Sequence, residues 1–298
     1  MKPVLIILLT VWLLFPGGPA RAQERVLFHD EELVIIGDAG LQPESDYIRQ
    51  IHPKTKAELE KTLDWAFLSK PVVLLTASRE NFERLGGSRF VSALAIPSDH
   101  LVVLFISPST ANPYILGDTY KHELCHLLLH DHIVKTDIPR WLDEGVCQWV
   151  SGTLGEILAG EAVPVSRLEI ARRFIPLQRL SAFFPMDREG ISLAYHESRD
   201  FISYVTARFG VRGLVGILHE MGKGEPVESA FPKALSVSFH DVQTAWIEDM
   251  QRKSEWLIWA SQNLYEILFF VAAVLAIAAF VRVKISRARY GNGDEDEE

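Results

Sequence analysis

The feature that most constrains this chain is the pentapeptide His122-Glu123-Leu124-Cys125-His126, which lies inside an apolar run. Residues four apart share one face of an α-helix, so His122 and His126 can offer two imidazoles to one metal ion. Glu123 lies beside them, where a carboxylate can take a proton from water. The alternative, two core histidines, would leave Glu123 as a buried unpaired charge. The pentapeptide therefore predicts a helix that carries part of a metal site.

A catalytic zinc site needs a third protein ligand and keeps one position open for water. Glu144 is the leading candidate, because it stands in the stretch Trp141-Leu142-Asp143-Glu144-Gly145, just past a turn at Ile138-Pro139. The sequence thus predicts a second helix that brings a carboxylate to the two histidines.

His132 is the alternative third ligand, six residues after His126, as in the pattern HExxHxxGxxH. That pattern needs a glycine where this chain has Leu129, and a helix that continues there would carry His132 away from the metal. Glu144 is therefore favoured over His132. His130 and His132 are then expected to be exposed groups at the helix end, where the dipole favours positive charge.

On these two motifs the chain resembles the gluzincin branch of the zincin metallopeptidases, in particular the peptidase-MA-like group of bacterial extracytoplasmic proteins. The resemblance covers roughly residues 70–250. It implies an α+β, zincin-like fold, with a small β-sheet and its edge strand, an active-site helix and a helix-rich C-terminal subdomain.

The resemblance also implies chemistry. It indicates a zinc-dependent metallopeptidase that hydrolyses peptide bonds of a peptide or protein substrate, with Zn²⁺ held by His122, His126 and Glu144. Glu123 would act as the general base. The alternative from another class is a non-catalytic peptide- or protein-binding module with a structural metal. The complete pentapeptide argues against it, because a binding module has no need of the base.

A residue that stabilises the oxyanion is implied by resemblance alone, in the motif Ala194-Tyr195-His196-Glu197-Ser198. Tyr195 and His196 are the candidates, and an aromatic packing residue beside a surface histidine is an equal alternative. Gln148, four residues past Glu144, could orient a ligand histidine, and this too stays open.

Segments rich in β-branched and apolar residues predict strands at 33–36, 71–75 and 101–106. In the resembled family, an edge strand at the third position pairs with an extended substrate; a buried core strand is the alternative. Apolar residues at helical spacing predict a series of helices, at 54–69, 78–85, 118–131, 141–158, 167–175, 192–209, 211–221, 227–235 and 239–252.

The two ends of the chain predict targeting. Residues 1–22 have the pattern of a secretory signal peptide, with an uncleaved anchor as the alternative. Residues 264–283 are long and apolar enough to span a bilayer, with aromatic residues before them and basic residues after them. We therefore expect residues 23–253 outside the cytoplasm, as an α/β part (23–135) and a mainly helical part (136–253), and a cytoplasmic tail at 284–298. The protein would be a single-pass protein of the cell membrane.

The net charge of −9 argues against nucleic acid as a partner, because no basic face compensates for the acidic excess. The expected partners are thus a peptide or protein substrate and the membrane.

Cys125 and Cys147 are the only cysteines, and each follows a proposed ligand by three residues. A disulfide between them would close a loop of about 22 residues and add roughly 3 kcal/mol in an oxidising compartment. Helices that cross with Cα atoms more than about 7 Å apart would instead leave two buried thiols. Both alternatives stay open, with free thiols slightly favoured. Thiolate ligation of the metal is disfavoured, because it would fill the open position.

Overall fold

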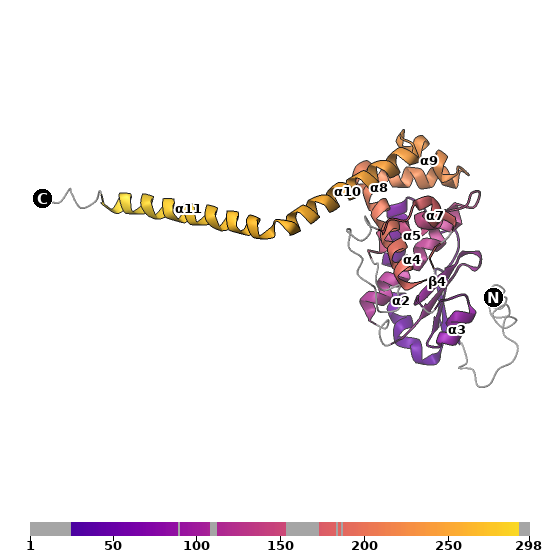
Figure 1. Ribbon diagram of the computed structural model, residues 1–298. Coiled ribbons are helices and arrows are strands. Elements are labelled where there is room, and N and C mark those ends of the chain that lie inside the picture. Colours follow the sequence, from indigo (N-terminus) through magenta and orange to yellow (C-terminus); the bar gives the residue numbers. More distant parts are fainter. Residues whose placement is uncertain are drawn as a thin grey trace.

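The structure is a computed structural model that describes residues 25–88, 90–107, 112–152, 173–182, 184–185 and 187–291. A sheet comes first in the chain and helices follow, which confirms a mixed, helix-rich α+β class (Figure 1). The expected signal peptide, and most of the helix expected at 167–175, lie outside the described residues. The elements in order are β1 (Arg25–His29), β2 (Val34–Gly37), η1 (Ala39–Leu41), α2 (Gln42–Leu63), β3 (Val72–Thr76), α3 (Arg79–Arg84), β4 (Ala93–Ile96), η2 (Pro97–Asp99), β5 (Leu101–Phe105), α4 (Pro113–His132), α5 (Arg140–Ser151), α7 (Leu177–Ala182), α8 (Arg188–Gly222), α9 (Val227–Leu235), α10 (Phe239–Gln262) and α11 (Leu264–Gly291).

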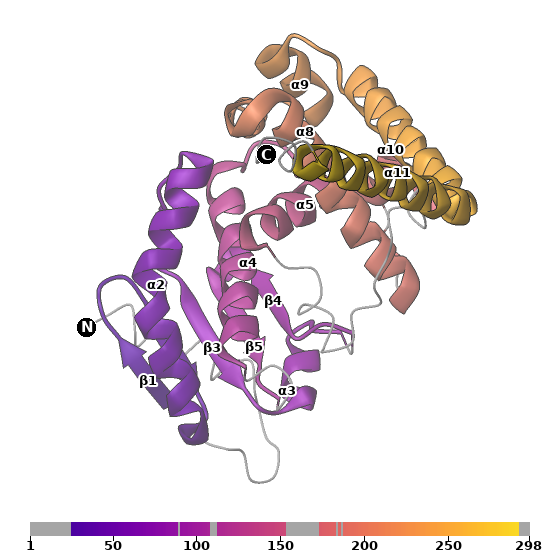
Figure 2. The same cartoon turned by 90° about the vertical axis from the view of Figure 1, so that its left-hand side faces the viewer.

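The five strands form one sheet in the order β1-β2-β3-β5-β4. The three central strands run parallel, and β1 and β4 pair antiparallel at the two edges. The central strands are almost entirely apolar, as expected where both faces of the sheet are covered. Alternate residues such as Ile35, Val73 and Val102 join the main core with α2 and α4, which lie across one face (Figure 2). Their neighbours pack with Phe82 of α3 on the other face.

The expected strand at 101–106 is β5, but it is not the edge of the sheet. It pairs with β3 on one side and β4 on the other, so the alternative of an interior strand holds. The edge is β4, a run of four residues that was not predicted. It is joined to β5 by η2 and by His100, whose φ of 50° lets the chain turn back sharply.

The helix expected at 54–69 is α2, which begins at Gln42 and ends at Leu63. Pro53 therefore lies within the helix rather than before it. Asp64, in the left-handed conformation with φ 55°, ends it. The other early elements fall close to expectation, including the short helix α3 capped by the Ser78 side chain, which accepts a hydrogen bond from the Asn81 N–H.

The later helices pack around α8. The chain breaks helical geometry at Gly210 (φ 74°, ψ 170°), the glycine expected to separate two helices. α10 continues past its expected end at Arg252, and only Asn263 separates it from α11. The first half of α10 packs into the core through Phe239, Trp246 and Met250, whereas its second half and α11 run away from the body (Figure 1).

Two described helices are long and apolar enough to cross a membrane, Glu189–Gly222 and Leu264–Ile285. The first belongs to α8 and is 39% buried inside the protein, whereas the second, in α11, is 0% buried. Only the second leaves its apolar side chains without a protein partner among the described residues.

Candidate active site

Helix α4 presents both histidines of the pentapeptide on one face. The helix begins with Pro113 after Asn112, whose side chain accepts a hydrogen bond from the Tyr114 N–H at 3.0 Å. His122 and His126 are buried, and their Nε2 atoms lie 3.0 Å apart. The spacing of four residues on this helix thus brings both rings toward one point.

Helix α5 brings Glu144 to the same point because it packs closely on α8. A Cβ at Gly145 would lie 2.6 Å from the Ser198 carbonyl oxygen and 2.9 Å from Ile202. Only glycine allows this approach, and its neighbour Glu144 is thereby held over α4.

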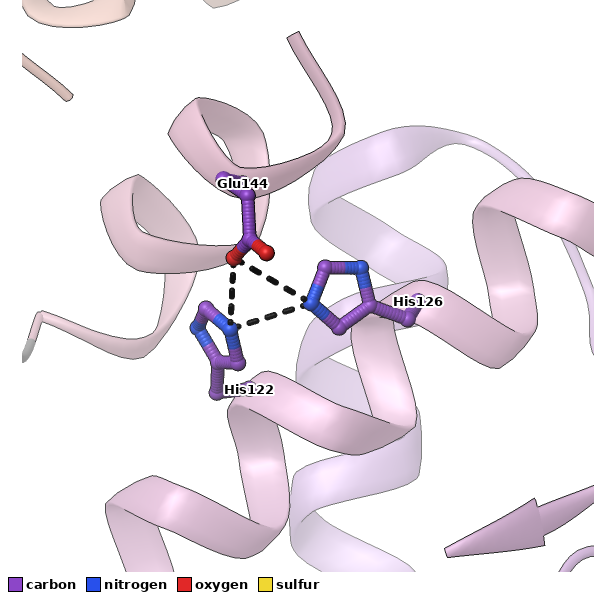
Figure 3. Close-up of side chains that lie close together, drawn as sticks. All are labelled: His122, His126 and Glu144. Carbon is purple, nitrogen blue, oxygen red and sulfur yellow. Dashed lines mark hydrogen bonds and ion pairs between the residues drawn. The ribbon is translucent and has the colours of Figure 1, made fainter. Parts of the chain in front are cut away.

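The three side chains form a triangle (Figure 3). Glu144 Oε2 lies 3.4 Å from His122 Nε2 and 3.7 Å from His126 Nε2. Ligand atoms about 2.1 Å from a tetrahedral zinc ion lie about 3.4 Å from one another. The three observed separations bracket that value, so His122, His126 and Glu144 could hold a metal ion.

Asp143 was not predicted, yet it organises this group. One carboxylate oxygen lies 2.7 Å from His126 Nδ1 and the other 3.0 Å from His130 Nε2. A carboxylate on the far nitrogen of a ligand histidine fixes its ring and its tautomer. That rule, applied to the acidic residue beside Glu144, could have found it from the sequence.

The ionisation of the group follows from these contacts. Burial alone would raise the pKa of the Asp143 carboxyl, but His126 and His130 outweigh it and hold this pKa below its usual range. Burial would also raise the pKa of the Glu144 carboxyl, but His122 and His126 outweigh it and lower this pKa. In return, burial would lower the pKa of His126, but Asp143 and the nearby glutamates raise it to about 10.

Glu123 lines a cavity of about 310 Å³ together with the two histidines, Glu144 and Tyr195. The edge strand β4 forms one wall through Ala93, Leu94 and Ala95. Burial raises the pKa of the Glu123 carboxyl, and His122 and His126 oppose that rise. A carboxylate at this position, beside a candidate metal site, could exchange protons with a ligand in the cavity.

The two oxyanion candidates occupy different environments. Tyr195 is buried on α8 and lines the cavity, 5.2 Å from the Phe184 ring centroid. Burial raises its pKa, Glu144 adds to the rise, and Arg140 opposes it. His196 is half-buried and is not among the residues that line this cavity.

The remaining polar candidates lie away from the triangle. His132 Nε2 is 2.7 Å from the Ala66 carbonyl oxygen and its ring stacks on Trp65 at 4.7 Å. His130 pairs with Asp143, and both histidines are half-buried, so neither is the exposed helix-end group expected. Gln148 is fully buried, and among the described residues its amide atoms have no hydrogen-bond partner. Asp143 is the residue that contacts the far nitrogen of a candidate ligand.

A disulfide joins Cys125 of α4 to Cys147 of α5, with Cα atoms 5.4 Å apart. The slight preference for free thiols is therefore wrong, because the helices cross within disulfide reach. The Cys147 sulfur also lies near His126 and Asp143, but the bridge occupies it. One covalent bond thus ties together the two helices that carry the triangle.

Two solved structures resemble this chain weakly. Aminopeptidase A of Legionella pneumophila, in complex with aspartic acid, gives a TM-score of 0.46 at 13% identity over 76% of this chain and 28% of that one. An M1 zinc metallopeptidase from Deinococcus radiodurans gives 0.44 at 15% identity over 76% and 51%. The chain thus spans about half of the Deinococcus protein and less than a third of the Legionella protein. TM-scores this low carry no structural argument. No curated protein sequence matches the chain.

The sequence profile of the Peptidase MA superfamily matches residues 89–251. This range holds β4, β5, α4, α5, α7, α8, α9 and the first half of α10. This match covers more than half of the 298 residues. The chain therefore belongs to the Peptidase MA superfamily.

Proposed function

We propose that this protein is a gluzincin-type zinc metallopeptidase that hydrolyses peptide bonds in a peptide or protein substrate. The observation that carries the proposal is the triangle of His122, His126 and Glu144 at zinc-like separations, with Glu123 in the same cavity. Membership in a peptidase superfamily supports it.

The three ligand side chains would hold Zn²⁺, which supplies Lewis acidity and acidifies a bound water. Asp143 would keep the His126 ring aligned. Glu123 would accept a proton from the attacking water and deliver it to the leaving amine. Tyr195, on the α8 side of the cavity, would donate a hydrogen bond to the developing oxyanion.

The substrate would bind along β4. This strand is the edge of the sheet and also a wall of the cavity. Unpaired backbone groups at a sheet edge can pair with an extended peptide, which would hold the scissile bond over the candidate metal site.

For location we propose that residues 23–253 lie outside the cytoplasm, after a signal peptide at 1–22, and that residues 264–283 span the membrane. The disulfide supports an oxidising compartment, and the exposed apolar α11 supports a span. In right-side-out vesicles, added protease should digest the domain and spare the tail at 284–298. Release of the intact protein by a carbonate wash would contradict a span.

The decisive test is Glu123→Gln. Purified wild-type protein should contain one zinc and cleave members of a broad peptide library. The variant should keep zinc and lose at least about 1,000-fold in turnover, because only the base is removed. Glu80→Gln, an exposed glutamate on α3, is the matched control.

Unchanged cleavage by Glu123→Gln would reject the mechanism. Zinc in the wild type with no cleavage of any peptide would favour the non-catalytic binding module instead.

A further inference from the structure

The cavity is lined by three carboxylates and one guanidinium, and these groups differ in their partners. Its three carboxylates, on Glu123, Asp143 and Glu144, all face histidines. Among the described lining residues, Arg140 is the one lysine or arginine. A fixed positive charge inside a cleft whose negative charges already have partners is available to a ligand.

Three groups hold Arg140 in place, and one of them is Tyr195, with which its side chain hydrogen-bonds. Its Nε lies 3.8 Å from Glu144 Oε1, the oxygen that does not face the two histidines. The guanidinium carbon lies 4.5 Å from the ring centroid of Phe184, which is itself buried. Stacking on the ring face leaves the N–H groups at the guanidinium edge pointing outward.

These contacts leave donors to spare. A guanidinium carries five N–H donors, and an ion pair at 3.8 Å is a loose one. The Arg140 side chain is 55% exposed, although it lines the cavity. A planar fork of this kind matches a carboxylate, which it can bind through two parallel hydrogen bonds.

Arg49 shows what distinguishes Arg140. It also pairs loosely with an acid on its own helix, Asp46 at 3.9 Å, is 53% exposed, and stacks over a ring, Phe28 at 5.4 Å. Arg49 lies on α2, outside the residues that line the candidate site. Both arginines combine a loose ion pair with a stacked ring, whereas only Arg140 also contacts Tyr195 and lines the cavity.

We propose that Arg140 binds a carboxylate of the substrate, so that the protein prefers peptides with an anionic group next to the scissile bond. This inference rests on the proposed function and names its substrate class. The anion can be an Asp or Glu side chain or the C-terminal carboxylate of the peptide, since both present the same group to the guanidinium.

The experiment compares wild type, Arg140→Gln, Arg140→Glu and Arg49→Gln on peptide libraries that differ in one position as Glu, Gln or Lys. Each library is made with a free and with an amidated C-terminus. Wild type should cleave the Glu or the free-carboxylate peptides best, mainly through a lower KM. Arg140→Gln should reduce that preference at least about tenfold, Arg140→Glu should shift it toward Lys, and Arg49→Gln should leave it unchanged.

The two carboxylate sources separate in the same data. A preference that disappears on amidation identifies the C-terminus, and one that survives amidation but needs Glu identifies a side chain. Equal preferences in wild type and Arg140→Gln would overturn the proposal, as would an equal loss in Arg49→Gln.

A binding measurement keeps the inference separate from the proposed function. Fluorescence anisotropy of the labelled Glu, Gln and Lys peptides is measured on zinc-loaded Glu123→Gln, with and without Arg140→Gln, at equal zinc content. Carboxylate-dependent binding that is lost with Arg140 supports the inference even if wild type cleaves nothing. Binding that does not depend on the peptide carboxylate or on Arg140 overturns it, even if wild type is an active peptidase.

Discussion

Two acidic sites in this molecule, one partly buried and one fully buried, reach opposite states of ionisation. At the α4–α5 crossing, Asp143 and Glu144 face histidines, and the pKa of each carboxyl falls below its usual value. On α8, Glu197 is 0% exposed, and both its oxygens accept from the Ile175 N–H, at 2.9 and 3.2 Å. Burial raises the pKa of Glu197 to about 8, the Ile175 N–H opposes the rise, and Asp200 adds to it.

The difference shows that burial does not decide the charge of a carboxyl group; its partners do. Histidines that can carry positive charge keep Asp143 and Glu144 ionised, which suits a metal ligand and the group that orients one. A single backbone N–H leaves Glu197 protonated at neutral pH. Its role is then structural, since it fastens the segment at Phe174–Pro176 to α8.

The largest effect should come from removing a carboxylate at the paired site. Glu144→Ala should weaken zinc binding by more than about 1,000-fold, because two histidines alone make a poor site. Zinc content after dialysis against a weak chelator measures this. Glu197→Gln is the matched control, which removes a buried carboxylate elsewhere and should keep the metal. Retention of zinc by Glu144→Ala would make the triangle irrelevant to metal binding.

The site at Glu197 should make the stability of the protein depend on pH. The folded-state pKa of Glu197, about 8, lies above the ordinary value of 4.5, so the folded protein holds this proton more tightly than the unfolded chain. The stability that this proton contributes is complete below about pH 4.5 and is lost as the pH rises to about 8. Glu197→Gln should remove up to about 5 kcal/mol of that loss.

The measurement is urea unfolding of both proteins at pH 5 and pH 9. The free energy of unfolding of the variant, relative to that of wild type, should be higher at pH 9 than at pH 5. A difference between the two proteins that is the same at both pH values would show that Glu197 is not protonated in the folded state.

Loss of the disulfide should affect both the stability of the fold and the paired site. Cys125→Ala with Cys147→Ala should lower the free energy of unfolding by about 3 kcal/mol, as expected for a loop of this length. It should also weaken zinc binding, because only non-covalent contacts, such as Asp143 with His126 and His130, then hold α5 against α4. Thermal unfolding of the variant, beside wild type in reductant, measures the first effect. Two titratable thiols in the denatured, unreduced wild type would contradict the bridge.

The smallest effect should come from Asp143→Asn, which keeps the shape and removes the charge. Zinc affinity should fall about 10- to 100-fold, the usual cost of losing the group behind a ligand histidine. Competition with a chromogenic chelator measures the zinc affinity. Asp46→Asn, at an exposed position on α2, is the control. An unchanged affinity would mean that Asp143 does not support His126.

Much of the fold follows from local pattern. The pentapeptide helix has apolar residues over several turns, and the central strands are continuous apolar runs, so both could be predicted. The edge strand β4 could not, because four residues carry little pattern and its place at the edge depends on pairing with β5. The helix predicted for α2 began only after Pro53, whereas the observed helix includes this proline. Packing against α4 and the sheet stabilises the helix although the proline removes one backbone hydrogen bond.

The candidate site divides in the same way. Spacing alone suggested which residues of α4 and α5 could meet, and the structure brings His122, His126 and Glu144 together. It did not single out the partner of His126. Asp143 stands beside Glu144 in the sequence, but whether it reaches the ring depends on the angle at which α5 crosses α4. Nor could spacing alone give the 5.4 Å between the cysteine Cα atoms, which depends on that same angle.

The join between α10 and α11 limits how far the cleft can move from the membrane. Thirteen residues lie between Met250, the last buried side chain described on α10, and Leu264, where α11 begins. As nearly continuous helix they measure roughly 20 Å, and a helix of this length does not coil like a flexible linker. With α11 in a bilayer, the cleft would travel at a nearly constant height above the lipid. Polypeptides held in that layer would meet it at a high effective concentration, whereas freely diffusing ones would gain nothing from the tether.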